Sequence, residues 1–299
     1  MRRACLIFVV TSAMLLGAWT RAETPRKRLG VLETPWSALL APAKSRDRAE
    51  LSRVAARIGV ARLGQALVHD DGEIRLAALQ ALPFLPQAIL LLPYLPPLVL
   101  SGPAVQRGQA IQTLADLLPI VDAERLAEWE IPKETTVATC KALAAAAADA
   151  TLGIPSRTLA LATLGASRMA CGAQDHSPLF ADRDAAIRRA AILASAPGDA
   201  NLLAALHAAA RDPAPTVVAA AGARLCRNKL GLPEPKDLWQ RMVKAKETAA
   251  EDLVDIVPCL ADGSSDDKAA LVFLRSHPSA SVREAAQATA KIDTKSQGN

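Results

Sequence analysis

The stretch that decides the fold runs from Asp182 to Cys226 and reads DRDAAIRRAAILASAPGDANLLAALHAAARDPAPTVVAAAGARLC. Residues 201–210 place three leucines on one helical face, namely Leu202, Leu203 and Leu206. Asp212-Pro213 ends that helix, because proline lacks a backbone N–H and disfavours helix in the residue before it. A second, alanine-rich helix follows from Val217 to Cys226. Neither helix can bury its apolar face alone, so the stretch predicts a stack of such helix pairs.

The composition of the chain agrees with closely packed helices. Of 299 residues, 51% are hydrophobic but only 3% are aromatic, so leucine, valine and alanine must build the core. Alanine has the highest helix propensity, and its small side chain lets helix backbones approach one another. No convincing run alternates with the two-residue period of a strand, so we predict an all-α fold.

Related segments recur along the chain. Residues 69–82 read HDDGEIRLAALQAL and residues 277–290 read HPSASVREAAQATA, both similar to DRDAAIRRAAILA from Asp182. We place the starts of equivalent helices at Ile74, Val105, Val137, Ile187, Val217 and Val282. The steps between them are 31, 32, 50, 30 and 65 residues. The 65-residue step corresponds to two units, and the 50-residue step predicts an irregular unit around Ser156.

These segments resemble HEAT repeats. A turn residue stands six positions before Arg75, Arg188, Val218 and Arg283; the four turn residues are His69, Asp182, Asp212 and His277. That spacing is similar to the turn acid and the Val-Arg pair of a HEAT unit, although the step is shorter than the usual ~40–47 residues. The resemblance implies an α-solenoid of stacked antiparallel helix pairs, with HEAT-like repeats of about 30–33 residues over residues 47–293.

Residues 82–100, LPFLPQAILLLPYLPPLVL, are almost wholly apolar. Five prolines interrupt them, and each removes a helix hydrogen bond that lipid cannot replace. We therefore predict short buried helices separated by proline turns rather than a membrane span. The alternative is an exposed interaction surface.

The N-terminus has the features of a secretory signal. Arg2 and Arg3 precede an apolar segment at residues 5–18, and Thr20-Arg21-Ala22 offers a cleavage site between small residues. The segment falls short of the ~20 apolar residues of a spanning helix, so an uncleaved anchor is the lesser alternative. We predict a signal peptide at residues 1–22 and export to the periplasm or the exterior. An irregular basic lead-in is predicted at residues 23–46 and a disordered tail at residues 294–299.

The charge is unevenly distributed. Loss of the three arginines in residues 1–22 lowers the formal charge from +5 to +2. Nine basic residues lie between Arg26 and Arg62, against only three acidic ones. This segment is either a solvated face of the first helices or a contact for anionic lipid or an acidic partner. Nucleic acid is disfavoured as a partner, because the exported chain is nearly neutral.

The sequence contains no recognisable catalytic or metal-binding constellation. The four histidines, His69, His176, His207 and His277, stand apart from one another, and no His-Glu pair occurs. Ser265 and Lys268 match the S-x-x-K spacing, but a helix N-cap explains this segment better. Asp262, Ser264 and Asp266 begin like a calcium loop that lacks its glycine and its closing glutamate. We predict no catalytic residues, no metal and no cofactor.

Four cysteines remain after residue 22, at Cys140, Cys171, Cys226 and Cys259. The spacings of 31 and 33 residues in the pairs Cys140–Cys171 and Cys226–Cys259 match the repeat step. Equivalent positions in adjacent hairpins can bring two Cα atoms within the ~4.4–6.8 Å that a disulfide requires. We predict these pairings if disulfides form; the alternative is four buried thiols.

The leading functional hypothesis is an exported, non-enzymatic scaffold that presents a curved helical-repeat surface to a protein or peptide partner. The alternative is a HEAT-like lyase that holds a small ligand on its concave face. A cavity with convergent polar groups would separate the two hypotheses.

Overall fold

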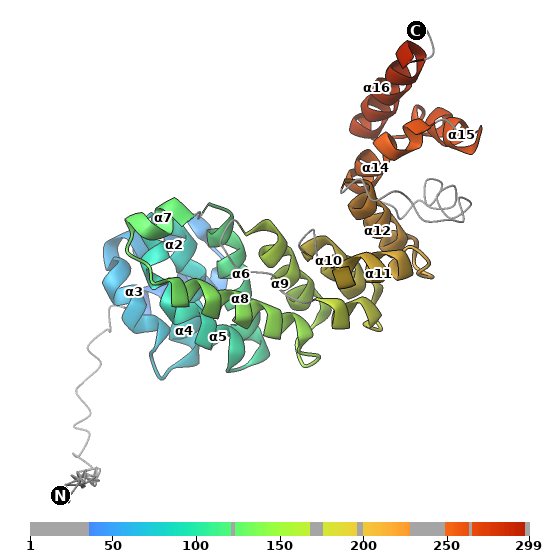
Figure 1. Cartoon of the computed structure of the whole chain (residues 1–299). Coiled ribbons are helices and arrows are strands. Elements are labelled where there is room, and N and C mark those ends of the chain that lie inside the picture. The colour runs from blue at the N-terminus through green and yellow to red at the C-terminus, as the bar shows by residue number, and fades with distance from the viewer. Residues whose placement is uncertain are drawn as a thin grey trace, which may run out of the picture. The chain divides into compact units, whose positions relative to one another are not determined.

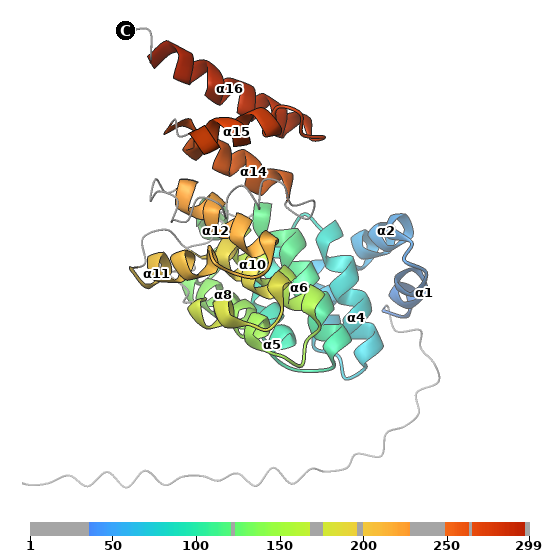
Figure 2. The same ribbon diagram turned by 90° about the vertical axis from the view of Figure 1, so that its right-hand side faces the viewer.

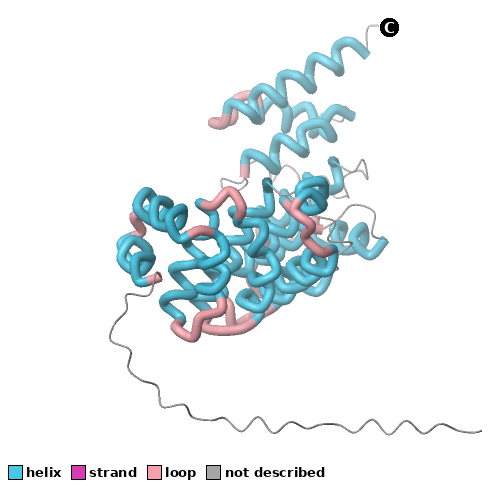
Figure 3. Tube along the Cα trace, turned by 90° about the vertical axis from the view of Figure 1, so that its left-hand side faces the viewer, coloured by secondary structure: helices cyan, strands magenta, loops and turns pink. Residues whose placement is uncertain are grey.

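The computed structural model describes residues 36–120, 123–167, 176–195, 200–227, 249–262 and 265–296. The chain divides into two units, Met1–Thr34 and Pro35–Asn299, and only the second contains described residues. The predicted signal peptide, most of the lead-in and the last three residues of the predicted tail therefore lie outside the described residues. Every regular element in the described ranges is a helix (Figure 3).

Four helices open the described chain: α1 Ser37–Ser45, α2 Arg48–Ile58, α3 Val60–Leu67 and α4 Gly72–Ala81. The side chain of Asp47 caps α2, and that of Asp71 caps α4, each by accepting a hydrogen bond from a backbone N–H of the first turn. Helix α1 corrects the irregular lead-in predicted over residues 23–46. Burial of Leu39, Pro42 and Ala43 outweighs the single hydrogen bond that Pro42 removes, and α1 packs on α4.

The apolar segment forms short pieces, as predicted. They are the 3-10 helices η1 Leu82–Phe84 and η2 Ala88–Tyr94, followed by α5 Leu95–Leu100. Most of their apolar side chains are buried, while Leu90, Tyr94 and Leu100 are exposed. No helix among the described residues is long and apolar enough to cross a bilayer.

The rest of the chain continues as helices. The elements are α6 Ala104–Leu117, η3 Leu118–Ile120, α7 Ala123–Glu128, α8 Lys133–Ala148, α9 Ile154–Ala166, η4 Ser177–Ala181, α10 Ala185–Ala194, α11 Ala200–Ala209, α12 Pro215–Arg227, α14 Ala250–Ile256, η5 Val257–Asp262, α15 Ser265–Leu274 and α16 Ala280–Ser296. Helix α14 lies between α12 and α16 in the stack and packs against both of them. The 65-residue step from α12 to α16 therefore spans two units.

The helices form a stack of pairs (Figures 1 and 2). One layer runs α4, α6, α9, α10, α12, α14 and α16, each in contact with the next. The pairs are α3 with α4, α5 with α6, α8 with α9, η4 with α10, α11 with α12, and α15 with α16. Short turns join the members of each pair, so the members run antiparallel. The chain is therefore an all-α solenoid of HEAT-like helix pairs.

The repeat position predicted at Val137 is wrong. Val137 lies on α8, the first helix of its pair, and α9 is the helix equivalent to α4 and α6. The long step thus falls between α6 and α9, because η3 and α7 are inserted there. Val137 itself is 42% exposed, whereas Ile74 and Ile187 are buried.

Small residues set the spacing of the stack. A Cβ on Gly165 of α9 would lie 3.1 Å from the Cα of Ala194 in α10. In α12 the residues Ala219–Ala223, including Gly222, are all buried. Helix backbones therefore approach closely here, as the alanine-rich composition predicts.

Candidate functional site

A repeated turn structure positions the second helix of several pairs. In each such turn a side-chain acceptor receives the backbone N–H two residues later. The acceptors are Asp149, Asp182 and Asp212 through Oδ1, at 2.8, 2.9 and 2.8 Å, and His69 and His277 through Nδ1, at 2.9 and 3.1 Å. Histidine replaces the turn acid because neutral imidazole offers an acceptor nitrogen at the same place.

Four arginines link these turns in a row that we call the turn-arginine ladder: Arg75, Arg107, Arg157 and Arg188. Each guanidinium donates to a backbone carbonyl before its own helix and reaches an acceptor in the following pair. The acceptors further along the chain are Gln106, Asp149, Asp182 and Asp212. Val218 takes the next position and ends the row. The ladder thus links neighbouring helix pairs by hydrogen bonds from charged guanidinium groups.

The sequence reveals two ladder arginines and conceals the other two. Arg75 and Arg188 directly follow the buried Ile74 and Ile187, so the pattern is plain. Before Arg107, however, Gln106 is only 5% exposed, while Val105, the predicted helix start, is 72% exposed. The predicted start at Val105 is therefore shifted by one residue. Gln106 is buried because its Oε1 accepts from Arg75 at 3.3 Å.

The pKa values of Asp149, Asp182 and Arg188 are shifted in the direction that favours the charged form. Hydrogen bonds from the Thr151 side chain and backbone, together with Arg107, lower the pKa of Asp149 from 3.8 to about 2. Burial acts against ionisation of Asp182, yet the Asp184 N–H and Arg157 outweigh it and lower the Asp182 pKa. A hydrogen bond to Asp212 raises the pKa of Arg188. These groups stay charged near neutral pH, so the ladder is structural rather than a source of acid–base catalysis.

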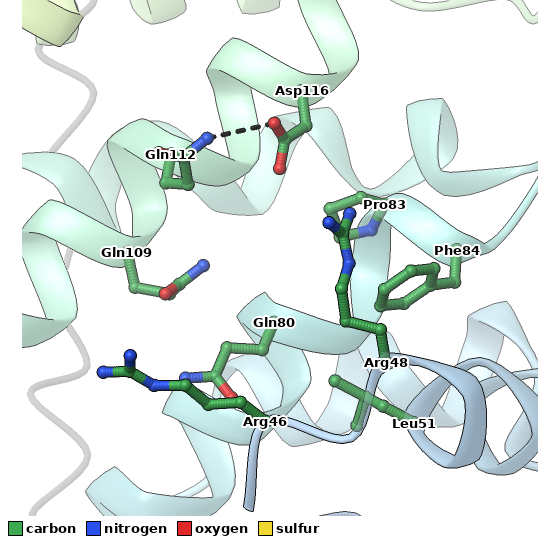
Figure 4. A pocket seen from close by; sticks show the side chains of 9 residues that line it. All are labelled: Arg46, Arg48, Leu51, Gln80, Pro83, Phe84, Gln109, Gln112 and Asp116. Atoms are coloured by element: carbon green, nitrogen blue, oxygen red, sulfur yellow. Dashed lines mark hydrogen bonds between the residues drawn. The ribbon is translucent and has the colours of Figure 1, made fainter. Parts of the chain in front are cut away.

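A cavity of about 380 Å³ opens beside α2, α4 and α6 (Figure 4). Together with a second, adjoining cavity it forms a groove, and we call this first cavity the polar half of the groove. Its lining residues are Arg46, Arg48, Leu51, Gln80, Pro83, Phe84, Gln109, Gln112 and Asp116. Three of them are glutamines, whose amides both donate and accept hydrogen bonds. Gln112 donates to Asp116 at 3.0 Å, while no hydrogen bond of the described residues engages the side chain of Gln80 or Gln109.

A second cavity of about 330 Å³ adjoins the first and is mainly apolar. The two share Pro83, Phe84 and Asp116, so they form one groove. The further lining residues of this apolar half are Leu85, Pro86, Ala88, Ile89, Leu117, Arg125 and Trp129. The groove therefore offers amides and guanidinium groups at one end and a hydrophobic surface at the other.

The groove was not predicted from the sequence, although a signal for part of it exists. Gln80 and Gln112 each stand five residues after a ladder arginine, Arg75 and Arg107 respectively. Equal offsets place them on the same face of consecutive helices. The shared face of Gln80 and Gln112 can be recognised only after Arg107 is aligned with Arg75, and the exposed Val105 obscures that alignment.

Two arginines enter the polar half: Arg46 follows the last residue of α1, and Arg48 is the first residue of α2. The Arg48 guanidinium lies 5.7 Å from the centroid of the Phe84 ring, a cation–π contact that fixes its direction. Arg46 ends α1 with φ 56° and ψ 30°, in the left-handed region that favours glycine. Figure 4 shows both side chains at the groove, with Arg48 alongside Phe84.

The structure joins Cys226 to Cys259 by a disulfide with a Cα–Cα distance of 5.8 Å, the pair that the 33-residue spacing predicts. Cys140 is also disulfide-bonded. Its predicted partner, Cys171, lies outside the described residues.

The structure scatters the remaining candidate residues. His69 and His277 serve in turns, His176 is buried beside η4, and His207 lies on α11. Helix α15 begins at Ser265, so that segment starts a helix as expected. Within the described ranges, no cluster of three potential metal ligands occurs.

Comparisons with known proteins give weak likenesses to helical-repeat structures. An engineered protein of the Northeast Structural Genomics Consortium is 15% identical, with 84% of this chain and 74% of that one covered and a TM-score of 0.41. A designed armadillo repeat protein is also 15% identical, with 85% and 96% covered and a TM-score of 0.36. Kap121p is 12% identical with a TM-score of 0.38; the match covers 85% of this chain and 37% of that protein. No protein-family model and no curated protein matches. The helix pairs and the ladder carry the HEAT-like assignment.

Proposed function

We propose that the chain is an exported, non-enzymatic scaffold whose groove over α2, α4, η1 and α6 holds an extended segment of a protein partner. The observation that carries the proposal is the set of glutamine amides along the polar half of the groove. An extended segment carries a backbone donor and acceptor at almost every residue, and side-chain amides can satisfy both. The free amides of Gln80 and Gln109 are suited to this role.

The lining of the groove does not favour the lyase alternative. It holds one carboxylate, Asp116, which already accepts a hydrogen bond from Gln112. General acid–base catalysis needs a positioned group with a shifted pKa, and usually a partner for it. No specific observation on the lining residues supports catalysis.

Export forms part of the proposal. Its support is the predicted signal peptide at residues 1–22 together with the Cys226–Cys259 disulfide, since disulfides persist mainly in oxidising compartments. N-terminal sequencing of the mature protein should begin at or near Glu23. A soluble pool that retains Met1 would contradict export.

Site-specific photocrosslinking tests the binding groove. A photoreactive amino acid replaces Gln112, and matched controls carry it at Gln65 on α3 and at Lys141 on α8, both exposed and outside the groove. We expect a discrete adduct in cells from position 112 and none from the control positions. Mass spectrometry then identifies the partner, and the purified pair gives the affinity. Adducts of equal yield from all three positions would contradict a specific groove.

A further inference from the structure

We infer that the groove selects an extended protein segment in which an acidic side chain and a large apolar one stand two residues apart, on the same side of the segment. The inference rests on the proposed function and names the chemistry of its ligand. Its basis is the pairing of two guanidinium groups in the polar half with a hydrophobic surface in the adjoining half.

The first step is the unbalanced charge of the polar half. Neighbouring basic residues have acidic partners: Lys44 pairs with Glu73 at 2.8 Å, and Arg53 and Arg57 pair with Glu50 at 3.0 and 3.5 Å. Across the described ranges, no ion pair involves Arg46 or Arg48. Two unpaired guanidinium groups at one cavity form a site for a carboxylate.

The second step is the fixed direction of one guanidinium. Arg48 is held over the ring of Phe84, and Figure 4 shows its side chain extending along that ring into the cavity. A guanidinium that already has its position loses less conformational freedom on binding a carboxylate. Asp116 is the one carboxylate in the same lining, so the two guanidinium groups leave the polar half with a net positive charge.

The third step is the backbone of Arg46. A non-glycine residue in the left-handed region is strained, and glycine is the usual residue at this helix-ending position. Glycine would adopt this backbone conformation at a lower conformational free energy than arginine does. We attribute its presence to the charge that it brings to the groove.

The fourth step is the apolar half. Phe84 belongs to both halves, and Ile89, Leu117 and Trp129 extend the hydrophobic surface beyond it. Side chains at alternate positions of an extended segment point to the same side. One segment can therefore place an acid against the arginines and a large apolar side chain against Trp129.

Fluorescence anisotropy with three labelled decapeptides tests the inference. In the first probe serine occupies every second position and glutamate and phenylalanine take turns at the remaining positions, so that both lie on the same side of the extended peptide. In the other two probes glutamine or lysine replaces glutamate. We expect the glutamate peptide to bind about tenfold more tightly than the glutamine peptide and the lysine peptide not to bind measurably. The affinity for the glutamate peptide should fall as salt rises.

Variants of the full chain locate the effect. Arg48→Gln should weaken binding of the glutamate peptide about fivefold, and Arg46→Gly should do the same while leaving the thermal unfolding midpoint equal or higher. The matched control Arg53→Gln removes one positive charge from α2 outside the groove and should change the affinity less than twofold. Arg46→Gly thus separates lost binding from lost folding.

Several results would overturn the inference. Equal binding of the glutamate and glutamine peptides, with both suppressing formation of the adduct at position 112, would remove the acidic preference but keep the groove. Failure of all three peptides to bind would also refute the inference, and the Gln112 adduct would still decide the proposed function separately. Binding to vesicles of phosphatidylglycerol that depends on Arg46 and Arg48, without peptide binding, would assign the arginines to a lipid surface instead.

Discussion

Replacing Arg188 by methionine should weaken the stack between α10 and α12. The Arg188 guanidinium forms two bonds of 2.7 Å to the carboxylate of Asp212 and donates to the carbonyl of Asp182 at 2.8 Å. The two side chains are only 13% and 10% exposed. Methionine keeps much of the packing volume but leaves the Asp212 charge without its cation. Breaking such a pair costs about 3 kcal/mol.

A double-mutant cycle separates this interaction from the loss of packing. Asp212→Asn removes the charge but keeps an oxygen that can accept from the N–H of Ala214. We expect a coupling energy of about 2 kcal/mol between the two substitutions. The exposed pair Arg53–Glu50, at 71% and 34% exposure, is the matched control and should give about 0.5 kcal/mol or less.

Native-state hydrogen exchange is the appropriate assay, because a repeat stack opens locally rather than in one step. In Arg188→Met the amides of α10 and α12 should exchange about 100-fold faster, while those of α4 should change little. A coupling energy no larger than that of the control pair would refute the ladder as a stabilising element. An equal loss of protection in α4 would refute its local action.

Three further outcomes follow from the structure. Gly165→Val should cost ~1–3 kcal/mol in urea unfolding, because the new side chain meets backbone atoms of Ala194; an unchanged midpoint would contradict this close approach. Replacing Cys226 and Cys259 by serine should cost ~2–4 kcal/mol, and reduction should then have less effect on the variant than on the wild type. The Asp149 pKa is lowered to about 2, so its contribution is present above about pH 4 and is lost as pH falls toward 2. The stability difference between wild type and Asp149→Asn should shrink over that interval; a constant difference would contradict the assignment.

The solenoid could be predicted from sequence because its signals are local. Apolar spacing, the aspartate or histidine that opens a turn, and isoleucine-arginine pairs each lie within one helix pair, and they recur. The α1 helix escaped prediction because Pro42 argues against helix locally, while the burial that stabilises α1 comes from α4. Tertiary packing outweighed the local signal.

The groove was harder to predict because it assembles distant segments. Its polar half combines residues from the α1–α2 turn, α2, α4, η1 and α6. Only the ladder register shows that Gln80 and Gln112 share a face. The prediction of a helix start at the exposed Val105, one residue too early, concealed that register. The unpaired state of Arg46 and Arg48 depends on where every nearby carboxylate lies, which composition alone does not reveal.

The central claim is that the face of α2, α4 and α6 binds the partner. Hydrogen exchange of the chain with and without the partner identified from the Gln112 adduct tests it directly. We predict protection in α2, η1 and α6, with no change in α3, whose exposed residues lie outside the groove. Protection confined to α3 and α8, or to α10 and α12, would contradict the claim.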